Sequence, residues 1–401
     1  MTAPADPSQK RHLLFVGMLG ALCALGPLSL SMHVQSIPVI VVDLASDYAT
    51  VQLTVSLFLA TFGLGMLLVG PLSDRLGRRP VLFGGLAVFA AASLSAALAP
   101  TADILIAARI GQAAGGAAAI IVARAVVQDA FPPARVAATM ALVAMLQSIA
   151  PAAAPILGGV VDWLLGWRAV FGLLAVTGIA LFVMSATRLA ETNPHRRAGT
   201  VAGWGEIAVR FLRLLGLRRY VGYVILLSFA TCGLFGFLSV GPAVIIGVLG
   251  HSRLAFSIML FVIAAMFSVG NYCTSRLLRR MHGDRVLKLG ALLNLFAMSL
   301  LFAGSFVPSA VTIVVPMCLY AIASGLVFPN AISGAVSVDP RIAGSAASFQ
   351  GFAQLASGAV LAFVIAALPT DTMRWMALAC LVMAAGAVAA LLLLPRRPAR
   401  G

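Results

Sequence analysis

Long apolar runs separated by short polar segments dominate the chain. Each run reaches the roughly 20 residues that an α-helix needs to cross a bilayer. The runs cover residues 12–38, 51–71, 80–99, 103–127, 136–162, 167–188, 219–247, 253–275, 286–306, 309–333, 342–368 and 372–394. The strands of a transmembrane β-barrel are shorter than these runs and alternate in polarity. Backbone N–H and C=O groups without hydrogen bonds are too costly in lipid, which leaves helices for runs of this length. The pattern therefore predicts an all-α integral membrane protein with twelve transmembrane helices.

One polar segment, Ala190 to Arg218, is much longer than the others. It divides the chain into a six-helix half over residues 1–189, a linker over 190–218 and a second six-helix half over 219–401. Two such halves are typical of a secondary transporter with a substrate path between them. Within the linker, helically spaced apolar and charged residues predict an amphipathic helix on the cytoplasmic membrane surface: Trp204, Glu206, Ile207, Val209, Arg210, Phe211, Leu212, Arg213 and Leu215.

Composition and charge agree with a membrane protein. Of the 401 residues, 61% are hydrophobic and only 10% are charged, whereas soluble chains are about one quarter charged. This argues against a soluble enzyme and against a nucleic-acid partner. Most of the 27 Lys and Arg fall in alternate loops, which predicts cytoplasmic termini and a multi-pass protein of the inner membrane. The first apolar run follows Lys10 and Arg11 but continues past Ile40 without a cleavage site, so we expect it to be a span.

Enzyme chemistry has no support in the sequence. There is no H-E-x-x-H, G-x-S-x-G or phosphate-binding loop. The five cysteines lie far apart in apolar stretches, which favours buried free thiols over a metal site. We therefore expect no cofactor and no metal, and transport driven by an ion or substrate gradient.

An ordered motif lies between the second and third spans. It reads Gly70-Pro71-Leu72-Ser73-Asp74-Arg75-Leu76-Gly77-Arg78-Arg79. Gly77 permits a tight turn, and Asp74 can lie near helix amino ends, which favour negative charge. The segment resembles the signature loop G-x-x-x-D-R-x-G-R-R of the major facilitator superfamily at every specified position.

Three further motifs extend the likeness over nearly the whole chain. Span four reads Arg109-x-x-Gln112-x-x-Gly115-Gly116, span five reads Pro151-x-x-x-Pro155-x-x-Gly158-Gly159, and span six opens with Gly166-Trp167-Arg168-x-x-Phe171. Ala343-Gly344-Ser345-Ala346 follows in span eleven. Together they resemble the bicyclomycin and chloramphenicol resistance branch of drug:proton antiporters. The resemblance implies a monomeric transporter that works by alternating access.

Two groups of residues carry conformational roles under this resemblance. The latch residues are Gly70, Asp74, Arg75, Gly77, Arg78, Arg79, Arg124 and Asp129. The resemblance implies that Asp74, Arg78, Arg124 and Asp129 form a cytoplasmic charge network, and the alternative is that these charges only fix topology. The hinge residues Pro151, Pro155, Gly158 and Gly159 would bend span five or pack it closely against a neighbour.

Arg109 is the most informative single residue. A guanidinium inside an apolar span costs about 3 kcal/mol on insertion scales, so it should face a polar interior, with Gln112 one turn away. The resemblance links this position to proton and substrate coupling. The alternative is an arginine that snorkels to the nearer surface.

Span one departs from the related pattern Pro-Leu-Ser-x-Asp-x-Tyr. Here Ser31 stands where the relatives have an acid, and none of the twelve acidic residues lies near the middle of a span. His33 is then the side chain best placed to carry a proton, because imidazole titrates near neutral pH. A neutral, hydrogen-bonding histidine is the alternative.

The remaining candidates are polar or aromatic residues within spans: Gln35, Gln147, Phe235, Asn271, Tyr320, Asn330, Gln350 and Gln354. Each alone can serve helix packing, whereas together they suggest a pocket for a small amphiphilic compound. A cavity with Arg109 favours neutral or anionic substrates. We expect proton-coupled export, with a proton-independent organic-anion carrier as the alternative and a non-transporting receptor or scaffold as a third reading.

Overall fold

The computed structural model describes residues 7–193, 204–339, 343–366 and 373–394. Helices account for nearly all of this part of the chain, and no strand occurs in it. Eleven of the described helices are long and apolar enough to cross a membrane, and Ala153–Leu165 forms a shorter apolar helical stretch. The predicted all-α membrane fold is thereby confirmed.

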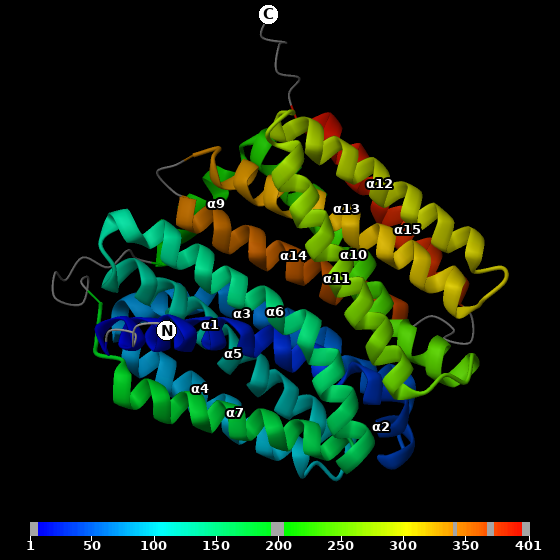
Figure 1. Ribbon diagram of the computed structural model, residues 1–401, viewed down its shortest axis with the longest axis horizontal. Coiled ribbons are helices and arrows are strands. Elements are labelled where there is room, and N and C mark those ends of the chain that lie inside the picture. The colour runs from blue at the N-terminus through cyan, green and yellow to red at the C-terminus, as the bar shows by residue number, and fades with distance from the viewer. Residues whose placement is uncertain (1–6, 194–203, 340–342, 367–372, 395–401) are drawn as a thin grey trace, which may run out of the picture. The chain divides into compact units, whose positions relative to one another are not determined.

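The chain divides into two compact units, which are described separately (Figure 1). Unit 1 comprises Met1–His33 and Leu64–Ala202. Its helices are α1 (Pro7–Met32), the second part of α3 (Tyr48–Leu76), α4 (Arg78–Ala97), α5 (Ala102–Ala130), α6 (Pro133–Leu165) and α7 (Trp167–Arg188). Small residues let α4 and α5 pack closely, since a Cβ on Gly115 would lie 2.7 Å from Cβ of Phe89.

Unit 2 comprises Val34–Gly63 and Gly203–Gly401. It holds the 3₁₀ helix η1 (Val34–Ser36), α2 (Ile37–Asp43) and the first part of α3. The later helices are α9 (Trp204–Leu215), α10 (Arg218–Pro242), the π-helix η2 (Ala243–Val248), α11 (Arg253–Leu277), α12 (Gly283–Gly304), α13 (Ala310–Val336), α14 (Ala343–Ala366), α15 (Met373–Ala390) and η4 (Leu391–Leu393). The Tyr48 hydroxyl donates to the Ser239 carbonyl at 2.7 Å and ties α3 to α10.

Helix pairing repeats within the two units. In unit 1, α1 packs on α6, α4 on α5, and α4 on α7. The helices at matching positions of the second half make the same pairs: α10 with α14, α12 with α13, and α12 with α15. The same helix pairing therefore occurs in both sets of helices, as expected of an internally repeated fold.

The first predicted span is not one continuous helix. The α-helix ends at Met32, and a 3₁₀ turn over Val34–Ser36 precedes α2. Pro38 explains the break, because it has no backbone N–H and its ring would clash with the carbonyl of Val34 in an uninterrupted α-helix. The break begins at His33, a predicted site residue, which is the last residue of the first segment of unit 1.

Candidate functional site

Arg109 is fully buried in unit 1, and its Nη1 donates to neutral polar groups. Its Nη1 donates to the Ser29 hydroxyl at 2.9 Å, to the Ser29 carbonyl at 3.2 Å and to Gln112 Oε1 at 2.7 Å. Gln112 Nε2 donates in turn to Ser93 Oγ at 2.7 Å. Arg109, Gln112, Ser29 and Ser93 all have 0% of their surface exposed. The guanidinium is thus held inside the helix bundle and does not reach a surface in this conformation.

Phe171 connects Arg109 with His33. The Arg109 Cζ lies 5.9 Å from the centroid of the Phe171 ring, and the His33 ring lies 5.7 Å from the same ring. A cation over an aromatic face is stabilised by the quadrupole of the ring, most strongly where water is excluded. His33 is also fully buried. The structure therefore brings the two leading site candidates to one aromatic side chain.

An N-cap at Thr101 fixes the position of Arg109 within α5. Thr101 precedes the helix and its hydroxyl accepts the Ile104 N–H at 3.4 Å. This N-cap fixes where α5 begins. Arg109 and Gln112 then fall three residues apart on one helix face, which permits their hydrogen bond.

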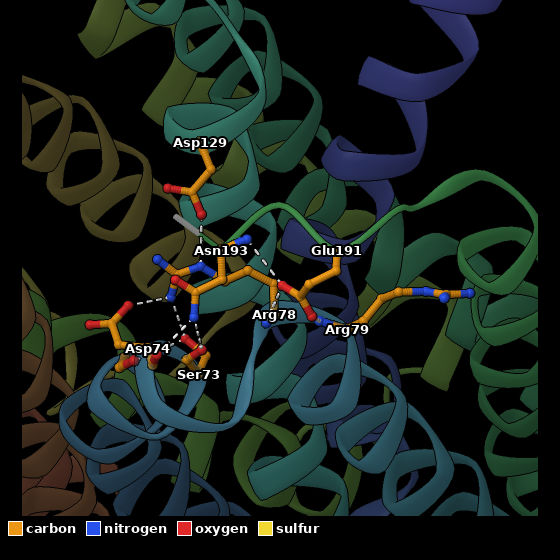
Figure 2. A network of polar contacts seen from close by, with 8 residues as sticks. Ser73, Asp74, Arg78, Arg79, Asp129, Glu191 and Asn193 are labelled. Carbon is orange, nitrogen blue, oxygen red and sulfur yellow. Dashed lines mark hydrogen bonds and ion pairs between the residues drawn. The ribbon is translucent and has the colours of Figure 1, made fainter. Parts of the chain in front are cut away.

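A second polar cluster surrounds Arg78 and contains several latch residues (Figure 2). Arg78 Nε donates to Asp129 Oδ2 at 2.8 Å, and its Nη1 pairs with Asp74 Oδ1. The same Nη1 donates to Ser73 Oγ at 2.7 Å. Arg78 is 5% exposed, so this is a nearly buried arginine bridging two carboxylates. Charge-assisted bonds of this kind are about twice as strong as neutral ones.

Glu191 and Asn193 complete this cluster, and the sequence analysis did not predict them. The Glu191 carboxylate accepts the backbone N–H groups of Arg78 at 3.0 Å and Arg79 at 3.1 Å. Asn193 Nδ2 donates to the carbonyls of Asp74 at 2.7 Å and Ser73 at 3.2 Å. The segment after α7 thus joins the carboxyl end of α3 to the amino end of α4, as Figure 2 shows.

Gly77 explains why a distant residue caps α4. It occupies the N-cap position with φ +106° and has no side chain to accept a bond. The first N–H groups of a helix have no internal partner and carry partial positive charge. Glu191 supplies the acceptor, whereas the sequence suggested Asp74 for a helix amino end. The sequence signal that could have pointed to Glu191 is an acidic residue in a linker that is rich in arginine.

Two other latch arginines bond to groups outside the Arg78 cluster. Arg124 Nη2 donates to Gln147 Oε1 at 3.1 Å, so its described bond is to a pocket candidate. Arg79 Nη2 donates to the Ala186 carbonyl at 3.1 Å. Arg75 is exposed. Gly70 accepts a bond from Ser73 Oγ through its carbonyl, and a Cβ there would meet nothing within 4 Å.

Comparison with known proteins decides the family. The sequence model of the Major Facilitator Superfamily matches residues 14–362. The chain belongs to the major facilitator superfamily. It is therefore a multi-pass protein of the inner membrane, and the resemblance seen in its motifs is confirmed.

Individual relatives of this superfamily chain cover most of its length. An uncharacterized MFS-type transporter YdgK of Bacillus subtilis is 29% identical over 89% of both chains. A chloramphenicol resistance protein of Pseudomonas aeruginosa is 28% identical over 92% of this chain and 87% of its own. Among solved structures, a D-xylose-proton symporter aligns with TM-score 0.75 at 15% identity, over 96% of this chain and 97% of its own. That last likeness concerns the fold alone.

The other pocket candidates of this superfamily chain divide between the units. Ser31 is half-buried on α1 of unit 1. In unit 2, the buried Tyr320 hydroxyl donates to the Ala230 carbonyl at 2.8 Å and accepts the Leu234 N–H at 3.0 Å. Gln350 donates to the Ala331 carbonyl at 3.4 Å, and Asn330 donates to its own helix. These bonds fit helix packing, the alternative reading of these residues. The others in unit 2 are the buried Gln35 and Phe235 and the half-buried Asn271 and Gln354.

The hinge residues lie in a helix that the structure keeps unbroken. α6 runs through Pro151, Pro155, Gly158 and Gly159 without interruption. Pro155 and both glycines are buried, whereas the side chain of Pro151 is outside the described residues. Close packing of this stretch is what buried glycines provide, and a hinge role stays a prediction.

Proposed function

We propose that the protein exports small neutral or anionic amphiphilic compounds by alternating access, as a monomer, with export driven by inward movement of protons. Its family and its drug-resistance relative support a transporter of this kind. Transport requires that the buried site open to each side in turn. The substrate-binding and coupling groups would be Arg109 and His33 of unit 1.

The full burial of Arg109, with its bonds to Ser29 and Gln112, is the observation that carries this proposal. A full positive charge in a low-dielectric interior repels an organic cation and attracts an anion or a polarisable neutral group. The sequence places no acidic residue near the middle of any span. The site therefore has a charge that selects against cationic dyes, which sets the proposed substrate class.

His33 is the proposed proton carrier. It shares the Phe171 ring with Arg109, so protonation of His33 would place two cations beside one aromatic side chain. A substrate group that donates a hydrogen bond to the unprotonated ring nitrogen of His33 would compete with the proton for that nitrogen. Substrate and proton would then occupy the site alternately, as antiport requires.

The Arg78 cluster is proposed to stabilise one conformation of the transport cycle. Its bonds link α3, α4, α5 and the segment after α7 within unit 1. Breaking a nearly buried arginine–carboxylate bond costs enough to separate two states by a few kcal/mol. The cluster would form in one state and open in the other.

Flux through proteoliposomes under an imposed pH gradient tests the proposal. Neutral phenicol-like compounds and small organic anions would be compared for wild type, His33→Ala, Arg109→Ala and the control Lys288→Ala, whose side chain is exposed. We expect uphill movement only with the gradient, loss of flux in Arg109→Ala and loss of pH dependence in His33→Ala. Unaltered flux in Arg109→Ala at equal expression would reject the assigned site.

A proton-independent carrier of organic anions is the second candidate. The same observation favours it, because a buried guanidinium can bind the acid group of a substrate directly. Under this alternative, flux would ignore the pH gradient and only anions would move. Arg109→Lys would then retain part of the flux, since lysine keeps the charge but loses the forked geometry.

A further inference from the structure

A tyrosine of α13 places its hydroxyl within the backbone of α10. Tyr320 Oη donates to the Ala230 carbonyl at 2.8 Å and accepts the Leu234 N–H at 3.0 Å. An α-helix normally bonds these two backbone groups to each other, because the donor lies four residues after the acceptor. A side chain inserted in this way is one of the causes of helix bending. These three residues form the Tyr320 bridge.

Gly233 makes room for the Tyr320 ring beside α10. A Cβ at position 233 would lie 2.5 Å from Cε2 and 3.0 Å from Cζ of that ring, so a larger residue would displace the ring. Thr231 loosens the same turn, because its Oγ1 donates to the Leu227 carbonyl at 2.7 Å, and such bonds within a helix often bend it. The turn 230–234 is therefore held less rigidly by its own backbone than a regular helical turn.

A repeated motif places the two halves of the chain in register. Residues 75–79 and 276–280 both read Arg-Leu-x-Arg-Arg, and each run begins in the last turn of a long helix, α3 or α11. The same difference in residue number relates Ser29 of α1 to Ala230 of α10. The Tyr320 bridge therefore has a counterpart in unit 1 with which it can be compared.

The matching point of the first half is where α1 ends. The Ser29 carbonyl accepts a bond from Arg109 Nη1 at 3.2 Å, and the α-helix ends just before His33, which matches Leu234 in the same register. In both halves a side chain from a neighbouring helix bonds to the matching carbonyl. Helix α1 is interrupted there, whereas α10 continues to Pro242. The bridge thus lies where the equivalent helix of unit 1 breaks.

Helix α10 is enclosed by protein, so a change in its bend would reach several neighbours. In its most apolar 18-residue stretch 83% of the residues are buried, more than in any other described span. It packs against α13, α14 and α15. Just after the bridge, a Cβ on Gly236 would lie 2.7 Å from Cys380 Sγ of α15. Because closely packed interiors transmit displacement, motion at the bridge would also shift α15.

We propose that the Tyr320 bridge opens and closes during the transport cycle, with Tyr320 as the positioning residue for the bend of α10. With the hydroxyl in place, the turn 230–234 is held open. When α13 withdraws the hydroxyl, the Leu234 N–H bonds directly to the Ala230 carbonyl and α10 straightens. Both arrangements satisfy these two backbone groups, which suits an element with two stable states. This role rests on the proposed function, since only a transporter cycles between such states.

Tyr320→Phe tests the bridge, because it removes the hydroxyl and keeps the ring. Tyr220→Phe is the matched control. Tyr220 is also buried and donates to a backbone carbonyl, that of Ala346 at 2.7 Å, but this bond bridges no helical turn. Gly233→Ala is a second test variant, since it keeps the hydroxyl and displaces the ring. It serves if Tyr320→Phe fails to fold, which the melting temperature in detergent reveals.

Two readouts are needed. The first is kcat and KM for proteoliposome flux of thiamphenicol and benzoate, a neutral and an anionic probe. The second is the distance between nitroxides at Val248→Cys, the end of η2, and Val311→Cys, in the first turn of α13, measured by double electron–electron resonance. These two side chains are 56% and 68% exposed. The labelled proteins carry alanine at the five native cysteines.

We expect Tyr320→Phe to lower kcat about tenfold and to leave KM within about twofold, because the bend affects interconversion of the two states and not binding. The label distance should change by about 3 Å or more, since the residues after the bridge form an arm of about 20 Å. Gly233→Ala should act in the same direction, and Tyr220→Phe should change neither readout.

An unchanged label distance in both test variants would overturn the proposal and leave Tyr320 a packing role only. An unchanged kcat despite a shifted distance would overturn its part in transport. Absence of thiamphenicol and benzoate flux in the wild type would instead reject the proposed function, while the label distance would still show whether the bridge sets the bend of α10.

Discussion

At the residue scale, Arg109 and Arg78 are both buried but have different hydrogen-bond partners. Arg109 is surrounded by neutral acceptors from Ser29 and Gln112, whereas Arg78 bridges the carboxylates of Asp74 and Asp129. Bonds to neutral acceptors do not themselves neutralise the charge of a guanidinium. Carboxylates neutralise it. The first arrangement suits binding and the second suits holding a structure together.

Glu191→Gln should weaken the amino end of α4. The amide keeps one acceptor oxygen but loses the charge that faces two backbone N–H groups. We expect a loss of about 1–2 kcal/mol in the free energy of unfolding, measured as a lower melting temperature in detergent. Asp103→Asn is the matched control, because Asp103 is an exposed acid in the first turn of another helix. Equal effects of both changes would contradict the assigned role.

Gln112→Leu should reduce transport by more than its loss of stability alone would explain. It removes the acceptor of the 2.7 Å bond from Arg109 and leaves Ser93 without its donor. An unsatisfied buried charge of this kind costs about 1–3 kcal/mol, and a misplaced guanidinium should slow flux at least about tenfold. Gln112→Glu adds a carboxylate that neutralises Arg109, so we expect it to fold well and to lose anionic substrates selectively. Retained anion flux in Gln112→Glu would contradict the proposed charge-based selection.

At the element scale, helix crossings depend on particular glycines. A Cβ on Gly115 of α5 would lie 2.7 Å from the Phe89 Cβ and 2.8 Å from its backbone nitrogen, both in α4. A Cβ on Gly84 of α4 would meet nothing within 4 Å. Glycine is therefore required at position 115, where the two helices cross, but not at position 84.

Gly115→Ala should destabilise the protein by about 1–3 kcal/mol, because the two helices must separate to admit the methyl group. Gly84→Ala should change stability by less than about 0.5 kcal/mol. Melting temperature and yield of folded protein in detergent measure both. Similar melting temperatures for the two variants would show that the crossing can adjust without cost.

At the scale of the whole molecule, the sequence predicted the helical membrane fold because lipid permits so few alternatives. Span lengths and the ordered motif between spans two and three were sufficient for the family. The break after Met32 was missed because the apolar run continues through Pro38, and hydropathy does not register a missing N–H. The missing backbone N–H of Pro38 therefore determines where the first helix breaks.

The site was predicted less completely than the fold. Arg109, Gln112 and His33 stood out because polar residues in apolar runs are costly. Their partners Ser29 and Ser93 did not, since serine is common at helix contacts. Glu191 lies 113 residues from Arg78, and only the folded chain brings them together.

The bonds of Glu191 and Asn193 have a consequence for where the chain can be cut. Both residues precede the rest of the linker and both are tied to the α3–α4 turn. A two-chain protein made from fragments 1–193 and 194–401 keeps Glu191 and Asn193 in the same fragment as the α3–α4 turn. A cut after residue 190 places both residues in the second fragment, apart from that turn. We expect the co-expressed 1–193 pair to have the higher melting temperature and to transport faster. Equal melting temperatures and transport rates for the two pairs would show that these bonds form equally well when Glu191 and Asn193 belong to the other fragment.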